Sequence, residues 1–149
     1  MDISDLIGPQ HVALDVRARD KGSLLRELGR RAAPFVGASA EAITNALAER
    51  ERLGSTGLGR GFALPHARMG EVSRLFGTFL RLGRPIEFQA IDERPVDLVF
   101  LLLIPADAGG NHVAALAAVS RRFRDAGTAE RLRRAESAEV AYQVLTSDG

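Results

Sequence analysis

The 149-residue sequence contains no cysteine, and it also lacks long apolar runs. The missing cysteines exclude a disulfide framework, thiolate metal sites and a cysteine nucleophile within this chain. The longest apolar run, residues 98–105, is far shorter than the ~18 residues that a membrane-spanning helix needs. The first five residues are acidic and do not resemble a signal peptide. We therefore expect a cytoplasmic protein without membrane insertion.

The sequence also lacks an excess of either charge, since 26% of residues are charged but the formal net charge is only +1. Such a balance gives no global field that would attract nucleic acid. Arginines gather at residues 121–124 and 131–134, but Glu130, Glu136 and Glu139 lie among them. This pattern is more typical of a solvated face than of a nucleic-acid surface. At this length, with 46% hydrophobic residues, residues 1–149 are expected to form one domain.

The most informative stretch is residues 54–68, which begins with four glycines in eight positions. Such a run predicts a loop with positive φ angles or a close backbone approach, because each glycine disfavours a helix by about 1 kcal/mol relative to alanine. Ser55 and Thr56 add hydroxyls, and amide-rich loops of this kind bind anions. His66 follows Pro65 directly, on a backbone with little freedom. We interpret the stretch as a phosphate cradle, contributed by Ser55, Thr56 and Gly57, with a nucleophilic imidazole at its edge.

Strand and helix patterns alternate along the chain. Strands are expected at residues 11–16, 75–82 and 96–104, with residues 83–85 ending the second. One helix is expected from an Asp20 cap to Ala33, closed by Pro34, and another from a Ser39 cap to Arg52. Further helices are expected over residues 112–124 and 128–135 and from a Ser137 cap to Leu145, with Val140 among the inward residues of the last. The strand at 96–104 is apolar on both faces, as in the centre of a covered sheet. The pattern predicts a three-layer α/β sandwich with a mixed, mostly parallel sheet flanked by helices.

Arg50 lies on the apolar stripe of the second helix, close to its end, whereas Glu49 and Glu51 fall off that stripe. A buried arginine is costly unless it is paired, so one interpretation is a structural ion pair or a residue at the helix end whose charged head reaches solvent. The other is that its guanidinium faces an anion held by the glycine loop, because a planar fork of donors suits phosphate.

His112 shares helical spacing with three apolar residues further along, so it is expected on the buried face of the first turn, with Asn111 as a cap. The helix dipole there favours a neutral imidazole, which can donate one N–H to a phosphate oxygen. A buried histidine with a structural hydrogen bond is the alternative. Ligands of parallel sheets sit at the carboxyl ends of strands, so the loops after Leu64 and Ile104 could bring His66 and His112 together. His11 is interpreted as a surface residue at a strand end.

The stretch Gly-Ser-Thr-Gly-Leu-Gly-x-Gly-x-Ala-Leu-Pro-His resembles the active-site signature of the phosphotransferase-system IIA domains of the fructose/mannitol type, in their nitrogen-regulatory branch. The resemblance runs from about Leu6 to Leu145. It implies a mixed sheet flanked by helices, phosphorylation of His66 on Nε2 by a histidine phosphocarrier protein, and active-site roles for Arg50 and His112. It implies no metal or other cofactor. The sequence departs from the family at Ala67 and Arg68, where a Gly-Lys pair is common.

Several functions stay open at this point. The nitrogen-regulatory branch suggests a free-standing regulator whose phosphorylation state controls partner proteins. The second reading is a sugar-transport subunit that passes phosphate to a IIB domain. Another alternative is a metal site in which His66, His112 and Asp107 are the ligands, since two histidines and one carboxylate are a known ligand combination. The last alternative, a binding module without chemistry, predicts that His66 can be replaced without loss of function.

Overall fold

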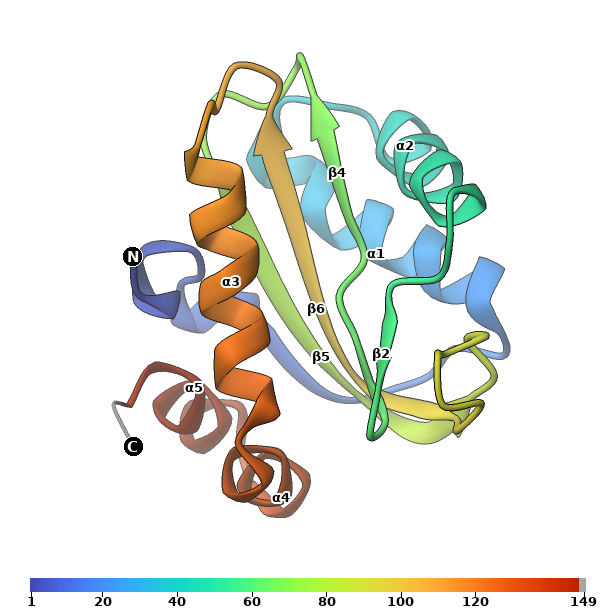
Figure 1. Ribbon diagram of the computed structural model, residues 1–149, viewed down its shortest axis with the longest axis vertical. Helices are drawn as coiled ribbons and strands as arrows, with labels where there is room; N and C mark the ends of the chain where they lie inside the picture. The colour runs from blue at the N-terminus through green and yellow to red at the C-terminus, as the bar shows by residue number, and fades with distance from the viewer. Residues whose placement is uncertain (148–149) are drawn as a thin grey trace.

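A six-stranded mixed sheet lies between two groups of helices in the computed structural model, which describes residues 1–147 (Figure 1). The strands are β1 (Val12–Val16), β2 (Gly57–Gly59), β3 (Phe62–Ala63), β4 (His66–Met69), β5 (Phe76–Ile86) and β6 (Val96–Pro105). Their order is β1-β5-β6-β3-β2. Strand β4 also pairs with β6, further along β6 than β3 does. The β1–β5, β3–β6 and β4–β6 pairs are parallel, whereas β5–β6 and β2–β3 are antiparallel. The predicted fold class is confirmed.

Strand β6 is the centre of the core and is buried on both faces, as its sequence predicts. Val99, Leu101 and Leu103 pack with the core on the side of the first two helices. Phe100 and Leu102 alternate with them and pack with the core under the last three helices. This alternation follows from the two-residue period of a strand, and it divides the hydrophobic core into two layers.

Helices α1 (Lys21–Val36) and α2 (Ala40–Arg52) cover one side of the sheet (Figure 1). Asp20 and Ser39 cap them as predicted, since each side chain accepts a hydrogen bond from a backbone N–H of the first turn. The expected end of α1 at Pro34 is wrong, because Pro34 lies inside the helix. The helix ends instead at Gly37, whose φ of 74° suits the left-handed position after a helix.

Helices α3 (Asn111–Arg124), α4 (Ala126–Arg134) and α5 (Ala138–Thr146) cover the other side, and two 3-10 turns, η1 (Ile3–Asp5) and η2 (Pro9–His11), precede β1. Ser137 caps α5 as predicted. Asn111 does not cap α3; the cap position is Gly110, and it has no side-chain hydrogen bond. Val140 was expected to point inward with the rest of its helix face, but it is exposed.

Strand β5 is longer than predicted. Residues 83–85 were expected to end it, but the strand continues to Ile86, which pairs with Val96 of β6. The pairing register shifts between Arg81 and Ile86, so the Gly-Arg-Pro segment interrupts the regular ladder without ending the strand.

Candidate functional site

The glycine stretch forms a small hairpin, in which β2 and β3 pair antiparallel and β3 in turn pairs with β6. Gly59 and Gly61 have φ angles of 100° and 81°, and Arg60 between them has φ 59°. These angles confirm that the turn needs residues which tolerate the left-handed region. The hairpin joins the end of α2 to the strand that carries His66.

Gly57 meets the second expectation, a close backbone approach. A Cβ at this position would lie 2.8 Å from both Cα and Cβ of Ala90. The Gly57 carbonyl accepts a hydrogen bond from the backbone N–H of Ile91 at 3.1 Å. The glycine therefore lets the loop pack directly against the β5–β6 connection, residues 87–95.

His66 is the first residue of β4, opposite Leu102 of β6. Its Nδ1 lies 2.8 Å from the carbonyl oxygen of Leu64. Because a carbonyl oxygen only accepts, Nδ1 carries the proton and donates it. In the neutral ring the lone pair is therefore on Nε2, which is the nitrogen available as a nucleophile.

The surroundings of His66 lower its pKa. Burial is the main cause, and the positive charges of Arg50 and His112 act in the same direction; the hydrogen bond to Leu64 and the negative charge of Glu51 raise the pKa. The net effect keeps the imidazole neutral, and therefore nucleophilic, at neutral pH. The same balance shows that side chains from α2 and from the start of α3 act electrostatically on His66.

Arg50 lies at the end of α2, is partly buried, and donates from Nη1 to the carbonyl oxygen of Gly54 at 3.1 Å. It forms no ion pair among residues 1–147. The structural-ion-pair interpretation is therefore wrong for the described part of the chain. Its remaining guanidinium N–H groups suit an anion beside the loop.

His112 lies in the first turn of α3 and is partly exposed, not buried as its helical spacing suggested. Its Nδ1 lies 2.7 Å from the carbonyl oxygen of Gly109, so Nδ1 carries a proton here as well. The expectation of a neutral donor therefore needs correction, because the single N–H of the neutral ring is already used. His112 can donate to a phosphate through Nε2 only when both ring nitrogens are protonated.

Both predicted loop hydroxyls take part in hydrogen bonds within the protein. Ser55 Oγ donates to the Phe88 carbonyl at 2.9 Å and accepts from the Gly57 N–H at 3.0 Å. Thr56 is buried, and its hydroxyl and N–H both donate to Glu51. A phosphate would have to exchange with these bonds, so phosphate binding by Ser55, Thr56 and Gly57 stays a prediction.

Glu51 is the residue that sequence reasoning missed. Its side chain is only 6% exposed, although the helical pattern placed it off the buried stripe. Its partners are Lys21 of α1, whose Nζ lies 2.8 Å from a Glu51 carboxylate oxygen, and Thr56 in the loop. The only available signal was that Lys21 is the sole lysine of the chain and starts the helix packed beside α2.

The metal-site alternative gains no support. Among residues 1–147, no three His, Asp or Glu side chains come together in a way that could hold a metal ion. Asp107, the third ligand of that alternative, is exposed in the turn after β6. Within the same residues, no helix combines the length and apolar character needed to cross a membrane.

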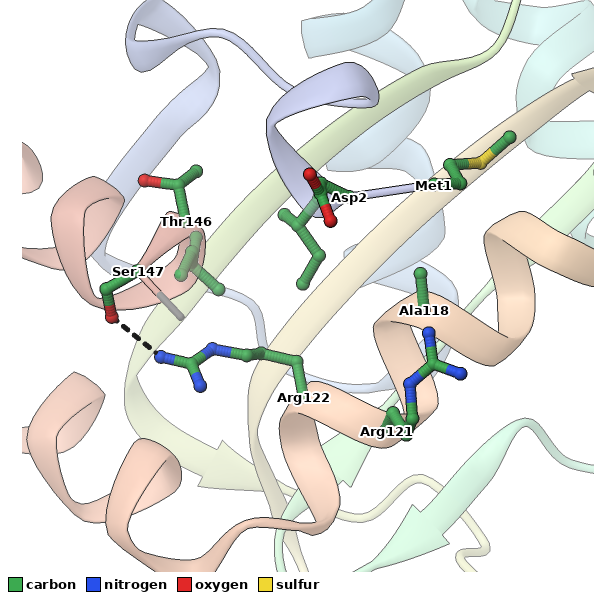
Figure 2. Close-up of a pocket in the computed structure, with 9 residues that line it drawn as sticks. Met1, Asp2, Ala118, Arg121, Arg122, Thr146 and Ser147 are labelled. Carbon is green, nitrogen blue, oxygen red and sulfur yellow. Dashed lines mark hydrogen bonds between the residues drawn. The ribbon is translucent and has the colours of Figure 1, made fainter. Parts of the chain in front are cut away.

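Three of the C-terminal arginines, Arg122, Arg133 and Arg134, contact groups of the same domain. Arg133 binds both carboxylate oxygens of Asp97 at 2.9 Å, and Arg134 pairs with Glu130. Arg122 donates to Ser147 Oγ at 2.9 Å beside a hollow of about 250 Å³ between η1, α3 and α5 (Figure 2). None of the predicted site residues lines this hollow, and Arg121, Arg124 and Arg131 are exposed, as expected of a solvated face.

The chain is similar to known proteins in both its sequence and its fold. A family model described as "Phosphoenolpyruvate-dependent sugar phosphotransferase system, EIIA 2" matches residues 5–148. A nitrogen regulatory protein of Bradyrhizobium diazoefficiens is 41% identical over 145 residues, which cover 97% of this chain and 95% of that protein. A fructose-specific EIIA component of Haloferax volcanii is 38% identical over 105 residues, covering 70% of this chain and 68% of that protein. The crystal structure of nitrogen regulatory protein IIA-Ntr from Neisseria meningitidis matches with a TM-score of 0.93 and 35% identity, covering 97% of this chain and 99% of that one.

Proposed function

The chain belongs to the EIIA type 2 family of the phosphoenolpyruvate-dependent sugar phosphotransferase system, and on this premise we propose that it carries a phosphoryl group on Nε2 of His66. The donor is a histidine phosphocarrier protein. The observation that carries the proposal is the hydrogen bond from His66 Nδ1 to the Leu64 carbonyl, which leaves the lone pair on Nε2. Burial supports it further, because it lowers the pKa of His66 and keeps the ring neutral.

The transfer exchanges one N–P bond for another. The lone pair on Nε2 of His66 forms a bond to phosphorus, and the donor's N–P bond breaks with its electron pair returning to the donor imidazole. A donor ring whose other nitrogen is protonated leaves as a neutral imidazole. His66 keeps its Nδ1–H, and the Leu64 carbonyl stabilises the positive charge that the phosphorylated ring gains.

Phosphoryl transfer depends mainly on positioning and on neutralising the charge of the transferred group. We assign Arg50 to charge neutralisation, because its charge acts on His66 and no carboxylate in the described chain pairs with its guanidinium. His112 acts from the start of α3, where Nε2 is the ring nitrogen that the Gly109 carbonyl leaves free to face the phosphate. Ser55, Thr56 and Gly57 are proposed to line the phosphate position, with Thr56 held in place by Glu51 and with the Gly57 N–H available to the phosphate once it leaves Ser55 Oγ.

The surface around the loop favours a protein as the donor. Leu53 at the end of α2 and Ile91 beside Gly57 are each 83% exposed, and Leu58 in β2 is 48% exposed. Large apolar side chains gathered around one polar site are typical of a protein-docking surface. Transfer from a phosphoenolpyruvate-fed carrier would place this protein in the cytoplasm.

We assign the downstream role to regulation, in which the phosphorylation state of His66 controls binding to partner proteins. Similarity to nitrogen regulatory proteins over nearly the full chain supports this assignment. Similarity to a fructose-specific EIIA component supports the alternative, a transport subunit that passes phosphate to a IIB domain. Incubating the phosphorylated protein with a cysteine-bearing IIB domain separates the two: rapid loss of phosphate to that cysteine would favour transport.

The direct experiment is intact-mass measurement after incubation with phosphoenolpyruvate, the general phosphotransferase enzyme and a histidine phosphocarrier. We expect one acid-labile phosphate on the wild type and on His11→Gln, and none on His66→Ala. His11 is a matched control because it packs between Phe35 and Phe76, with ring centroids 4.5 and 4.8 Å away. Labelling of His66→Ala at the wild-type rate would refute the proposal.

A further inference from the structure

Glu51 is a buried carboxylate with an unusually complete set of partners. One oxygen accepts from Lys21 Nζ at 2.8 Å and from the Thr56 N–H at 3.1 Å, and the other accepts from the Thr56 hydroxyl. Its side chain is 6% exposed and that of Lys21 is 18% exposed. A buried ion pair is tolerated only when further hydrogen bonds satisfy it, as they do here.

The same pair ties the loop to the β5–β6 connection. Lys21 Nζ lies 4.5 Å from the centre of the Phe88 ring and also donates to Gln89 Oε1 at 3.4 Å. The carbonyl of Phe88 accepts the Ser55 hydroxyl at 2.9 Å. The loop from Gly54 to Gly57 is therefore held on one side by Glu51 and on the other by the residues that contact Lys21.

We propose that Glu51, paired with Lys21, is a positioning residue for phosphoryl transfer to His66, an inference that rests on the proposed function. Glu51 fixes the loop against the end of α2, where Arg50 precedes it in the helix and donates to the Gly54 carbonyl. A loop held in this way keeps the Arg50 guanidinium in one place before phosphate arrives. Preorganised donors stabilise the transferring group more than donors that must first be ordered.

Lys21 has a second effect, on charge. A carboxylate close enough to raise the pKa of His66 would also repel an incoming phosphoryl dianion. The ammonium of Lys21, in direct contact with Glu51, offsets this repulsion. The pair thus lets a carboxylate hold the loop without placing uncompensated negative charge at the phosphate position.

The test compares initial labelling rates of four variants with the wild type: Glu51→Gln, Lys21→Met, Lys21→Arg and Glu49→Gln. Glu49→Gln is the matched control, because it removes the same charge from the same helix and, within residues 1–147, Glu49 pairs only with the exposed Arg52. We expect Glu51→Gln and Lys21→Met to slow transfer by about 10- to 100-fold, as small displacements of a positioned group do. Lys21→Arg and Glu49→Gln should stay within about threefold of the wild type, since each keeps the pair.

Two readouts distinguish positioning from a purely structural role. At varied donor concentration, Glu51→Gln should lower kcat and leave KM within about threefold, because the donor-docking surface is intact. The groups that act on His66 are Arg50 and Glu51 from α2 and His112 from α3, so Glu51→Gln should also shift the titration of His66 to lower pH. Glu49→Gln should not shift it. A double variant Glu51→Gln with Lys21→Met should be no more than about threefold slower than the slower single variant, because the two residues act as a unit.

Circular dichroism and thermal unfolding confirm that each variant is folded, and a Glu51→Gln protein that fails to fold leaves Lys21→Met as the test. Labelling of either folded variant at the rate of Glu49→Gln, or a loss that appears only in KM, would overturn the inference. These outcomes are separate from a failure of the proposed function, in which the wild type itself accepts no phosphate.

Discussion

The two histidines of the site make the same hydrogen bond in different surroundings. His66 and His112 each donate Nδ1–H to a backbone carbonyl, at 2.8 and 2.7 Å. His66 lies in a strand paired with the central β6, where burial lowers its pKa. His112 lies in the partly exposed first turn of a helix. The carbonyl holds the proton on Nδ1 in both rings. For the remaining nitrogen we propose different roles, a nucleophile in His66 and a hydrogen-bond donor to the phosphate in His112.

The two regions also differ in how firmly they are held. The register between β4 and β6 fixes the backbone of His66, and Glu51 fixes the loop that leads to it. The start of α3 follows Gly109 and Gly110 and has no side-chain cap. We infer that the His66 side is preorganised, while the His112 side adjusts to the bound group. The predictions below test this contrast.

The largest expected effect separates the two histidines completely. His66→Ala should abolish phosphorylation, whereas His112→Ala should still reach full labelling, only more slowly, because it lacks a donor and not the acceptor atom. Intact mass at long incubation times measures both end points. Full labelling of His66→Ala together with none of His112→Ala would reverse the assignment.

Loss of one side chain that donates a hydrogen bond to the phosphate should have the next largest effect. His112→Ala and Arg50→Ala should each slow labelling by about 10²–10³-fold, if each supplies one donor to the transferring group. Rapid-quench rates with saturating phosphocarrier measure the loss. Asn111→Ala is the control for the His112 side, since its side chain forms no cap. Rates within twofold of that control would remove the variant residue from the mechanism.

A methyl group added to either side should reveal the difference in rigidity. Gly57→Ala would place Cβ 2.8 Å from Ala90 and should destabilise the protein by about 1–3 kcal/mol, the usual cost of overpacking. At Gly110→Ala, apart from the adjoining backbone, no atom of the described residues lies within 4 Å of the new Cβ, so the unfolding free energy should change by no more than about 0.5 kcal/mol. Urea unfolding measures both. Equal destabilisation by the two substitutions would contradict the contrast between the regions.

The smallest expected effect is on pH dependence. Because the folded-state pKa of His66 is lowered from its ordinary value of 6.5, the neutral nucleophile should persist below pH 6.5. The same shift means that the unfolded chain binds more protons, so this group costs stability as pH falls from 6.5 through the folded-state pKa. NMR titration of the imidazole should show a midpoint below 6.5. A midpoint above that value would contradict the role assigned to burial.

Sequence alone predicted most of the frame of the site. The buried strand β6, the Ser39 cap and the positive φ angles of the glycine stretch follow from local patterns, and the structure confirms each of them. The short strands β2, β3 and β4, which were expected as loop, were missed. The end of α1 was predicted wrongly, because packing and the left-handed Gly37 outweigh the local preference of Pro34 to end a helix. Local propensity is a weak guide wherever tertiary contacts compete with it.

The missed features share another physical cause. Glu51 looks solvent-facing on a helical wheel, yet partners from α1 and from the loop enclose its carboxylate. The tautomer of His112 depends on the Gly109 carbonyl, which only the backbone path reveals. Both depend on contacts between segments that helical periodicity does not bring together. Residue type and spacing therefore indicated the candidate site, whereas its hydrogen bonds could not be predicted because they depend on how the chain folds.

The most direct test of the central claim is the position of the phosphate on the imidazole of His66. NMR of the phosphorylated, ¹⁵N-labelled protein distinguishes Nε2-phosphohistidine from Nδ1-phosphohistidine by the coupling of phosphorus to the ring nitrogens. The account predicts phosphate on Nε2 of His66, with Nδ1 still protonated and donating to Leu64. Phosphate on Nδ1 of His66 would contradict it, because that atom is engaged with the Leu64 carbonyl. Phosphate on His112 would contradict the choice of His66 as the acceptor.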